Sequence, residues 1–112
     1  MERAREIIFY ERNFQDFYKA LRPKVKKKID WTLLLIQTYL QVPEKYLKHI
    51  EGTEGLYEIR VQSGSDIFRI FCFFDRGKLI VLLNGFQKKT MKTPIIEIER
   101  ALKLKRQYEN TK

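Results

Sequence analysis

The sequence predicts an α+β fold in the order β-α-α-β-β-β-α, with a mainly antiparallel twisted sheet, an N-terminal helical hairpin and a C-terminal helix. Apolar residues first recur with the helical period and later with the period of strands. Turn-forming residues separate the strand-like runs, and a Thr-Pro pair precedes a last amphipathic segment. A chain of 112 residues has the size of one domain, so we expect residues 1–112 to form a single domain.

The N-terminal part predicts one strand and two helices. Residues 6–10 form a short apolar run typical of a strand, and Asn13 is a suitable N-cap for the helix that follows. Residues at the helical spacing come next: Phe14, Phe17, Tyr18 and Leu21. Pro23 suits the first turn of a second helix, which we expect to end before Pro43. Its apolar stripe is Val25, Ile29, Leu33, Ile36 and Leu40.

The C-terminal half predicts a three-stranded meander and a helix. Residues 44–55 are a polar connection, and strands are expected at 57–61, 67–74 and 79–86. Turn residues at 63–66 and 75–78 join these strands. Thr93 is expected to cap the last helix, with Pro94 at its first position.

The central strands are apolar on both faces. In the last strand we expect Leu79, Val81 and Leu83 on one face of the sheet. Ile80, Leu82 and Phe86 are expected on the other face. One face is covered by the helical hairpin, so the second face needs the C-terminal helix, a partner chain, or both.

The charge balance suggests a polyanionic partner. The chain carries 23 Lys and Arg against 14 Asp and Glu, a formal net charge of +9. Most of the excess lies in residues 57–112, which hold 12 cations against 6 acids. A hydrophobic content of 44% is too high for a disordered chain, and no apolar run reaches the ~18 residues of a membrane span. We expect a soluble cytoplasmic protein without a secretory signal.

Single residues argue against several kinds of site. Cys72 is the only cysteine and His49 the only histidine, so we expect no disulfide, no metal site and no cofactor. Cys72 lies in an aromatic strand and is expected to be buried, whereas His49 is expected to be exposed in the connector. Trp31 and Tyr39 lie off the apolar stripe of the second helix and are expected to be packing or edge residues and not platforms for base stacking.

Two arginines stand in the middle of predicted strands. Arg60 and Arg69 lie on adjacent strands joined by one turn, so both guanidinium groups can reach one patch of the sheet. A cation in a strand is costly unless its face is open or it has a partner. The simpler alternative is that Arg60 forms a surface ion pair with Glu58 or Asp66.

Two groups of lysines accompany the arginines. Lys88, Lys89 and Lys92 follow the last strand, where a loop lysine can contact phosphate, although a solvated basic loop would look the same. Lys24, Lys27 and Lys28 lie on the second helix, where a solvated face is the simpler reading.

Several segments resemble the RelE/HigB superfamily of type II toxins, and within it the branch of phage-derived toxin proteins. These segments are Gly55-Leu-Tyr-Glu-Ile-Arg60, Ile67-Phe-Arg-Ile-Phe71, Leu82-Leu-Asn-Gly-Phe-Gln-Lys-Lys-Thr90, Lys92-Thr-Pro94 and Ile98-Glu-Arg-Ala101. The resemblance covers nearly the whole chain, including the order of its elements. It implies a small toxin that cuts mRNA in the ribosomal A site and is blocked by a cognate antitoxin, in this branch one with a helix-turn-helix domain.

The resemblance also implies roles for individual residues. Arg69 matches the strand arginine near the scissile phosphate, and Arg60 matches a basic position on the preceding strand. Lys88 and Lys89 match the basic residues that end the last strand, and Lys92 is a further RNA-binding candidate by position. The implied reaction is a metal-free attack of the RNA 2′-hydroxyl on the adjacent phosphate. The RNA-binding residues expected on the second helix are Lys24, Lys27 and Lys28.

The sequence departs from better-known members of the family near its C-terminus. Some members have a tyrosine or histidines there that assist proton transfer, whereas this chain offers only Tyr108, and His49 lies far upstream. The general base therefore stays open between a lysine among Lys88, Lys89 and Lys92 and the solvent or ribosome.

Two other functions fit the same fold. ParE-like relatives bind and inhibit a DNA topoisomerase without cutting RNA, and a prophage remnant could bind nucleic acid without any activity. Arg69 together with Lys88–Lys92 favours cleavage over inhibition of a topoisomerase.

Overall fold

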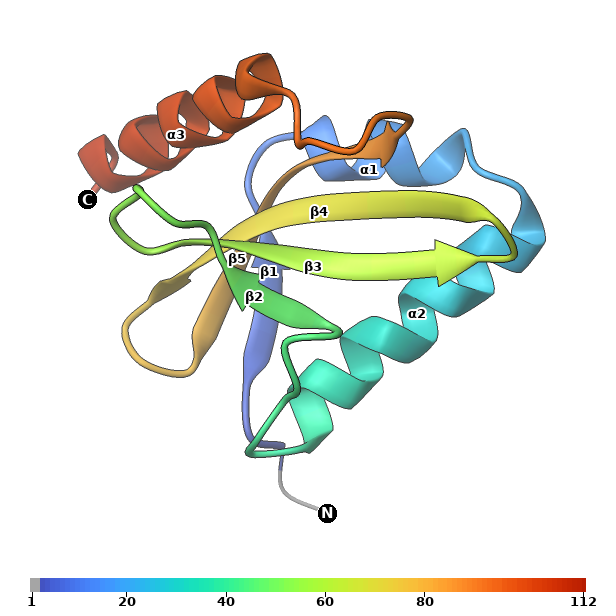
Figure 1. Cartoon of the computed structure of the whole chain (residues 1–112). Coiled ribbons are helices and arrows are strands. Elements are labelled where there is room, and N and C mark those ends of the chain that lie inside the picture. The colour runs from blue at the N-terminus through green and yellow to red at the C-terminus, as the bar shows by residue number, and fades with distance from the viewer. Residues whose placement is uncertain (1–2) are drawn as a thin grey trace.

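The computed structural model describes residues 3–112 as one sheet with helices on both faces (Figure 1). The elements are β1 (Glu6–Phe9), α1 (Asn13–Lys19), α2 (Pro23–Thr38), β2 (Leu47–His49), β3 (Leu56–Ser63), β4 (Asp66–Asp75), β5 (Leu79–Lys88) and α3 (Ile95–Asn110). The predicted α+β class is confirmed, and so is the order of the predicted elements, to which the short strand β2 is added. None of the helices within residues 3–112 is long and apolar enough to cross a membrane.

The sheet has the strand order β1-β5-β4-β3-β2. β1 runs parallel to β5, and the other neighbours are antiparallel, as the predicted mainly antiparallel sheet requires. β2 lies in the segment predicted to be a polar connection, because three residues are too few to show strand alternation. It pairs with β3 only from Tyr57 to Ile59. In the described chain, no strand continues this pairing along residues 61–63, so that edge of β3 stays open.

The first core lies between the sheet and the two N-terminal helices. The predicted stripes are largely confirmed, since Phe14 of α1 and three stripe residues of α2 are buried there against the strands: Val25, Ile29 and Ile36. Cys72 is also fully buried in this core, and burial raises the pKa of its thiol. The expectation for Leu40 is wrong, because α2 ends at Thr38 and Leu40 is 73% exposed.

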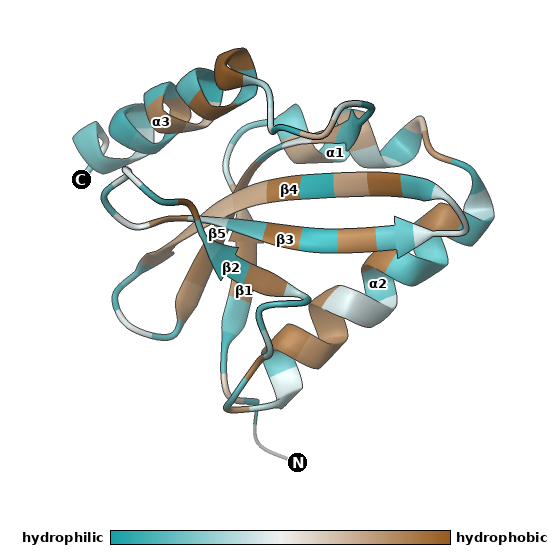
Figure 2. Cartoon of the chain, in the orientation of Figure 1, coloured by the Kyte–Doolittle hydropathy of each residue, from teal (hydrophilic) through white to brown (hydrophobic). Residues whose placement is uncertain are grey.

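The second core lies under α3. Ala101 and Leu104 of this helix pack on the opposite face of the sheet, against Phe71, Phe73, Val81, Leu83 and Phe86. The C-terminal helix therefore packs on the second face of the sheet, which is one of the two expected ways to cover it. It contacts β4 and β5, but it lies away from the β3–β4 turn, which projects toward the start of α2 (Figure 1). One end of this sheet face is thus left uncovered by helix, and hydrophilic bands interrupt the hydrophobic strands β3 and β4 (Figure 2).

A bulge in β5 corrects the predicted facing of Phe86. Ile70 pairs with Gly85, but Cys72 pairs with Leu82, so β5 holds one residue more than β4 over this stretch. The extra residue turns Phe86 to the face of Val81 and Leu83, not to that of Ile80 and Leu82 as predicted. It also lets the buried Asn84 reach α3, where its Nδ2 donates to the Glu97 carboxylate at 3.1 Å.

The predicted helix caps are each displaced by one residue. Asn13 is the first residue of α1, and Arg12 takes the cap position without a side-chain hydrogen bond. Pro94 takes the cap position of α3, so Thr93 lies outside the helix and Ile95 begins it. Helix ends are commonly displaced by a residue or two from a sequence-based boundary.

Candidate functional site

Arg60 and Arg69 lie directly opposite each other on β3 and β4. Residues that are directly opposite in an antiparallel pair point to the same face of the sheet, so the two guanidinium groups share one surface patch, as predicted. That face is the one on which α3 packs further along the strands. The β3–β4 turn fixes this register, since Ser63 pairs with Asp66 and every pair follows from there.

Glu58 holds the two arginines together. Its Oε2 lies 3.5 Å from Arg60 Nε, and its Oε1 lies 3.5 Å from Arg69 Nε. Glu58 and Arg69 are each only 6% exposed, whereas Arg60 reaches solvent. The simpler alternative for Arg60 is thus partly correct, because Arg60 does pair with Glu58. Asp66 instead pairs with Arg22 at 2.8 Å.

The electrostatics of Arg69 are those of a cation held out of water. Burial lowers the pKa of Arg69, the Glu58 carboxylate opposes this shift, and the neighbouring Arg60 charge adds to it. Arg69 Nη1 donates to the Phe68 carbonyl at 3.1 Å. Within the described residues, Arg69 Nε and Glu58 Oε1 have no hydrogen-bond partner, so these two atoms attract at ion-pair distance only.

A cleft of about 520 Å³ opens beside the arginine pair, along the free edge of β3. Among residues 3–112, no aspartate or glutamate lines it, and four cations do: Lys28 from α2, Lys45 before β2, and Arg60 and Arg69 from the sheet. Tyr46 lies in its wall as well, and its carbonyl accepts a hydrogen bond from the Arg60 N–H at 2.8 Å. Such a cleft attracts an anion, and guanidinium groups match the oxygens of a phosphate.

A second hollow of about 450 Å³ adjoins the cleft at the β3–β4 turn. The lysines predicted to bind RNA, Lys24, Lys27 and Lys28, line it together with Trp31. Lys28, Gln62 and Gly64 belong to both hollows. The basic stripe of α2 is therefore continuous with the arginine cleft, a proximity that helical spacing alone could not reveal.

The lysines after β5 come near this region without lining it. Lys88 is the last residue of β5 and lies opposite Ile67, which forms part of the cleft wall. Lys89 and Lys92 are exposed in the loop that leads to α3, and neither lines either hollow. Arg60 and Arg69 thus share one patch of the sheet, as predicted, while Lys88 lies one strand away on the same face.

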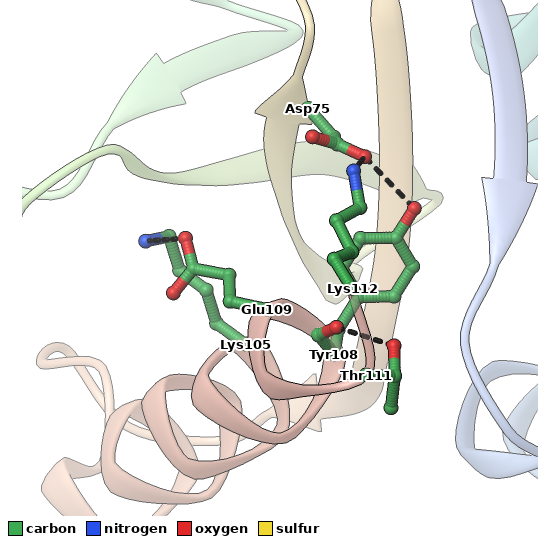
Figure 3. Close-up of polar contacts among 6 residues, drawn as sticks. All are labelled: Asp75, Lys105, Tyr108, Glu109, Thr111 and Lys112. Atoms are coloured by element: carbon green, nitrogen blue, oxygen red, sulfur yellow. Dashed lines mark hydrogen bonds and ion pairs between the residues drawn. The ribbon is translucent and has the colours of Figure 1, made fainter.

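The two other ionisable candidates lie elsewhere. His49 is exposed as expected, and its ring stacks edge-on against Tyr57, which faces the first core. The hydroxyl of Tyr108 donates to Asp75 at 2.9 Å (Figure 3). Asp75 is six residues beyond Arg69 on β4, or about 20 Å along a strand. Tyr108 therefore cannot take part in chemistry at the arginine pair.

Sequence reasoning missed three residues of this region. The sequence did not predict strand β2, and Lys45 and Tyr46 precede it. No local pattern therefore indicated that these two residues lie at the cleft. Glu58 was considered only as an ion-pair partner of Arg60, although its position two residues before Arg60 already placed it on the same face. Within residues 3–112, no group of three or more His, Cys, Asp or Glu side chains is placed to hold a metal ion.

Comparisons with known proteins agree with this architecture. Residues 16–106 match the family described as "Phage derived protein Gp49-like (DUF891)". No curated protein matches the chain significantly. Among solved structures, the chain is similar to one in the crystal structure of the archaeal RelE-RelB complex from Pyrococcus horikoshii OT3. The TM-score is 0.56 at 15% identity, over 80% of this chain and 99% of that chain, which is a likeness of fold. The chain therefore belongs to the phage-derived Gp49-like family, in agreement with the phage-derived branch that its sequence segments resemble.

Proposed function

We propose that this protein is a type II toxin that cleaves mRNA in the ribosomal A site. One observation carries the proposal: a buried arginine, Arg69, is paired across the sheet with Arg60 at the wall of a cleft that no acidic side chain of the described residues lines. A buried arginine beside a second guanidinium group is unfavourable for folding, even with Glu58 between them, and a ligand that needs both charges explains the arrangement. A phosphodiester of RNA is such a ligand.

The chemistry requires stabilisation of negative charge more than a protein nucleophile. The RNA supplies its own nucleophile, because the 2′-hydroxyl oxygen attacks the adjacent phosphorus and the bond to the 5′-oxygen breaks. The products are a 2′,3′-cyclic phosphate and a 5′-hydroxyl. Negative charge accumulates on the phosphoryl oxygens in the transition state, where Arg69 and Arg60 would stabilise it. Glu58 acts as a positioning residue that fixes both guanidinium groups.

The reaction also requires proton transfer. The 2′-hydroxyl must lose a proton and the leaving oxygen must gain one. Lys28, Lys45 and Tyr46 line the cleft, whereas Lys88, Lys89 and Lys92 do not. We therefore assign proton transfer to solvent or to one of these three cleft residues, and we assign phosphate binding to Lys88, Lys89 and Lys92 further along the RNA.

Induced expression of Arg69→Ala beside the wild type tests this function. The wild type should arrest translation and produce new transcript ends within codons. Arg69→Ala should do neither, although it folds with the same circular dichroism spectrum and melts cooperatively. The matched control is Arg106→Ala, which removes an exposed arginine of α3 and should stay fully toxic. Full toxicity of a folded Arg69→Ala protein would refute the assignment of the site.

The same experiment separates the competing functions. Intact transcripts together with DNA damage would favour inhibition of a DNA topoisomerase, as in ParE-like proteins. Harmless overexpression of the wild type would identify an inactive nucleic-acid-binding remnant. A basic cleft can bind nucleic acid with or without cleavage, so mapped RNA ends, DNA damage and toxicity are needed together to decide between the three functions.

A cognate antitoxin completes the proposal. The similar archaeal chain was solved in a RelE-RelB complex. By analogy, we propose that an acidic antitoxin with a helix-turn-helix domain binds this chain, whose net charge is +9. A gene beside this one that encodes such a protein should suppress toxicity on co-expression and copurify with the toxin. A neighbouring product that neither binds nor protects would contradict this part.

A further inference from the structure

Trp31 is placed where a tryptophan would not be expected for packing alone. It is 46% exposed on the outer side of α2 and belongs to neither hydrophobic core. Tryptophan carries more apolar surface than other residues, and leaving half of it in water gives up much of the free energy of burial. Its surroundings are basic, because Lys24, Lys27 and Lys28 line the same hollow. The sequence-based expectation of a packing or edge residue does not explain this environment.

Trp31 forms a pair with Tyr46. The two ring centroids lie 5.6 Å apart at an interplanar angle of 71°. Each ring also has its own ammonium group: Lys28 Nζ lies 5.0 Å from the Trp31 centroid, and Lys45 Nζ lies 5.6 Å from the Tyr46 centroid. A ring with a lysine ammonium group beside it is suited to a nucleotide, because the base can stack on the ring while its phosphate binds the cation.

The pair joins the two hollows described above. Trp31 lines the lysine-rich hollow, Tyr46 lines the arginine cleft, and Lys28 lines both. A strand whose phosphate lies at Arg60 and Arg69 could therefore place a neighbouring base against the rings without crossing a region of negative charge.

We propose that Trp31 and Tyr46 form a stacking platform for an unpaired base of the RNA strand that occupies the arginine cleft. The inference rests on the proposed function, because it takes that strand to be the substrate. Only an unpaired base exposes its faces for stacking, so the platform would select single-stranded RNA over a duplex. An acidic polypeptide would use the lysines but would have no need of the rings.

Trp31 is the only tryptophan in the chain, so its fluorescence reports on the platform directly. The wild-type protein is titrated, without ribosomes and at low salt, with an unstructured RNA oligonucleotide of about 12 nucleotides. Stacking should quench the emission along the same curve as binding measured by anisotropy of labelled RNA. Trp31→Ala should bind about tenfold more weakly, and Trp31→Phe should recover most of that loss. The control Tyr39→Ala removes an exposed ring outside both hollows and should bind normally.

Several results would overturn the inference. These are an absence of binding, binding with unchanged emission, or wild-type affinity in Trp31→Ala. Equal quenching by duplex RNA or by polyglutamate would show a general anionic or protein-binding surface. If quenching persists unchanged in Arg60→Ala, the RNA that stacks on the rings is not the strand that binds in the arginine cleft.

Failure of the proposed function would look different. If the wild type quenches with RNA but never cleaves on ribosomes, the platform stands and the nuclease assignment fails. If the wild type cleaves on ribosomes while its emission is unchanged by bound oligonucleotide, the nuclease assignment stands and the platform fails.

Discussion

At the scale of single residues, the Arg60–Glu58–Arg69 group lowers the free energy of unfolding, because it holds charged side chains out of water. Arg69 and Glu58 are buried together, and their closest atoms make an ion pair without a hydrogen bond. Buried ion pairs of this kind add little net stability, but removing one partner leaves an uncompensated charge. Here the removal of Glu58 would leave two guanidinium groups facing each other.

Glu58→Ala should therefore lower the free energy of unfolding more than the removal of an exposed acidic side chain does. We expect a loss of about 3 kcal/mol in the free energy of unfolding, because Arg69 loses its buried counter-charge. Urea denaturation at neutral pH measures it. Glu109→Ala is the matched control, since Glu109 pairs with Lys105 at the surface and its removal should cost less than about 1 kcal/mol. Equal losses in the two variants would show that Glu58 does not hold the arginines.

Arg69→Lys separates charge from shape. Lysine keeps the positive charge but lacks the planar fork that binds two phosphate oxygens at once. We expect RNA cleavage on ribosomes to fall by about 100-fold with little change in fold, which single-turnover rates would measure. A lysine variant with the wild-type rate would show that a point charge suffices.

At the scale of elements, Gly85 and the adjacent bulge in β5 set the contacts of two helices. Gly85 leaves room for α1, because a Cβ there would lie 2.5 Å from Cδ2 of the Phe17 ring. The same bulge turns Phe86 and Asn84 toward α3. Gly85 thus sets the contact with the helix on one face, and the adjacent bulge sets the contacts with the helix on the other face.

Gly85→Ala should destabilise the fold by about 1–3 kcal/mol through overpacking against Phe17. Thermal and urea unfolding measure the loss. Phe17→Leu in the same chain should restore part of it, because the smaller side chain leaves space for the new methyl group. If the two losses simply add, the steric explanation is wrong.

The end of α3 is fastened to the β4–β5 turn through Asp75. Tyr108 and Lys112 both donate to its carboxylate, and Lys105 pairs with Glu109 on the same helix (Figure 3). The contact with Lys112 lowers the pKa of Asp75, and the Tyr108 hydroxyl contributes, although partial burial opposes them. Burial and the bond to Asp75 raise the pKa of Tyr108.

This fastening predicts a pH dependence of stability. A carboxyl whose pKa is lowered by folding stabilises the protein above its unfolded pKa of 3.8 and loses that effect as pH falls below it. Wild type should therefore be more stable than Asp75→Asn at neutral pH, and the difference should shrink below pH 3.8. Urea midpoints across this range measure it. A difference that is independent of pH would contradict the assignment.

At the scale of the whole molecule, six cations gather in the two hollows at the end of the sheet that α3 leaves uncovered. The helix α3 covers one end of its face, and the lysines of α2 extend the arginine cleft around the open edge of β3. A long anionic strand could therefore contact the protein over both hollows, which the net charge of +9 favours at long range.

Salt dependence of RNA binding should show how many of these cations meet phosphates. Replacing Lys24, Lys27 and Lys28 by glutamine should reduce the slope of log affinity against log salt by about 2. Anisotropy titrations over a range of salt concentrations measure this slope. The control replaces Lys103 and Arg106 of α3, both exposed and outside the hollows, and should leave the slope unchanged. Equal slopes in all three proteins would exclude α2 from the RNA-binding surface.

Local sequence patterns predicted the features that depend on neighbouring residues, namely the helices and the hairpin register. The helical spacing of Phe14 and Ile29 marked α1 and α2, and the short turn before Asp66 fixed Arg60 opposite Arg69. The bulge at β5 escaped prediction because it depends on packing between elements. The same is true of the approach of Lys28 to the cleft, which joins α2 to an open strand edge.

The end groups of the RNA products test the central claim most directly. Purified toxin is added to ribosomes that carry a defined mRNA, and the fragments are analysed for their termini. We predict a 2′,3′-cyclic phosphate on the upstream fragment and a 5′-hydroxyl on the downstream fragment, with both absent for Arg69→Ala and present for Arg106→Ala. Fragments that end in a 5′-phosphate, or equal cleavage by Arg69→Ala, would contradict the account.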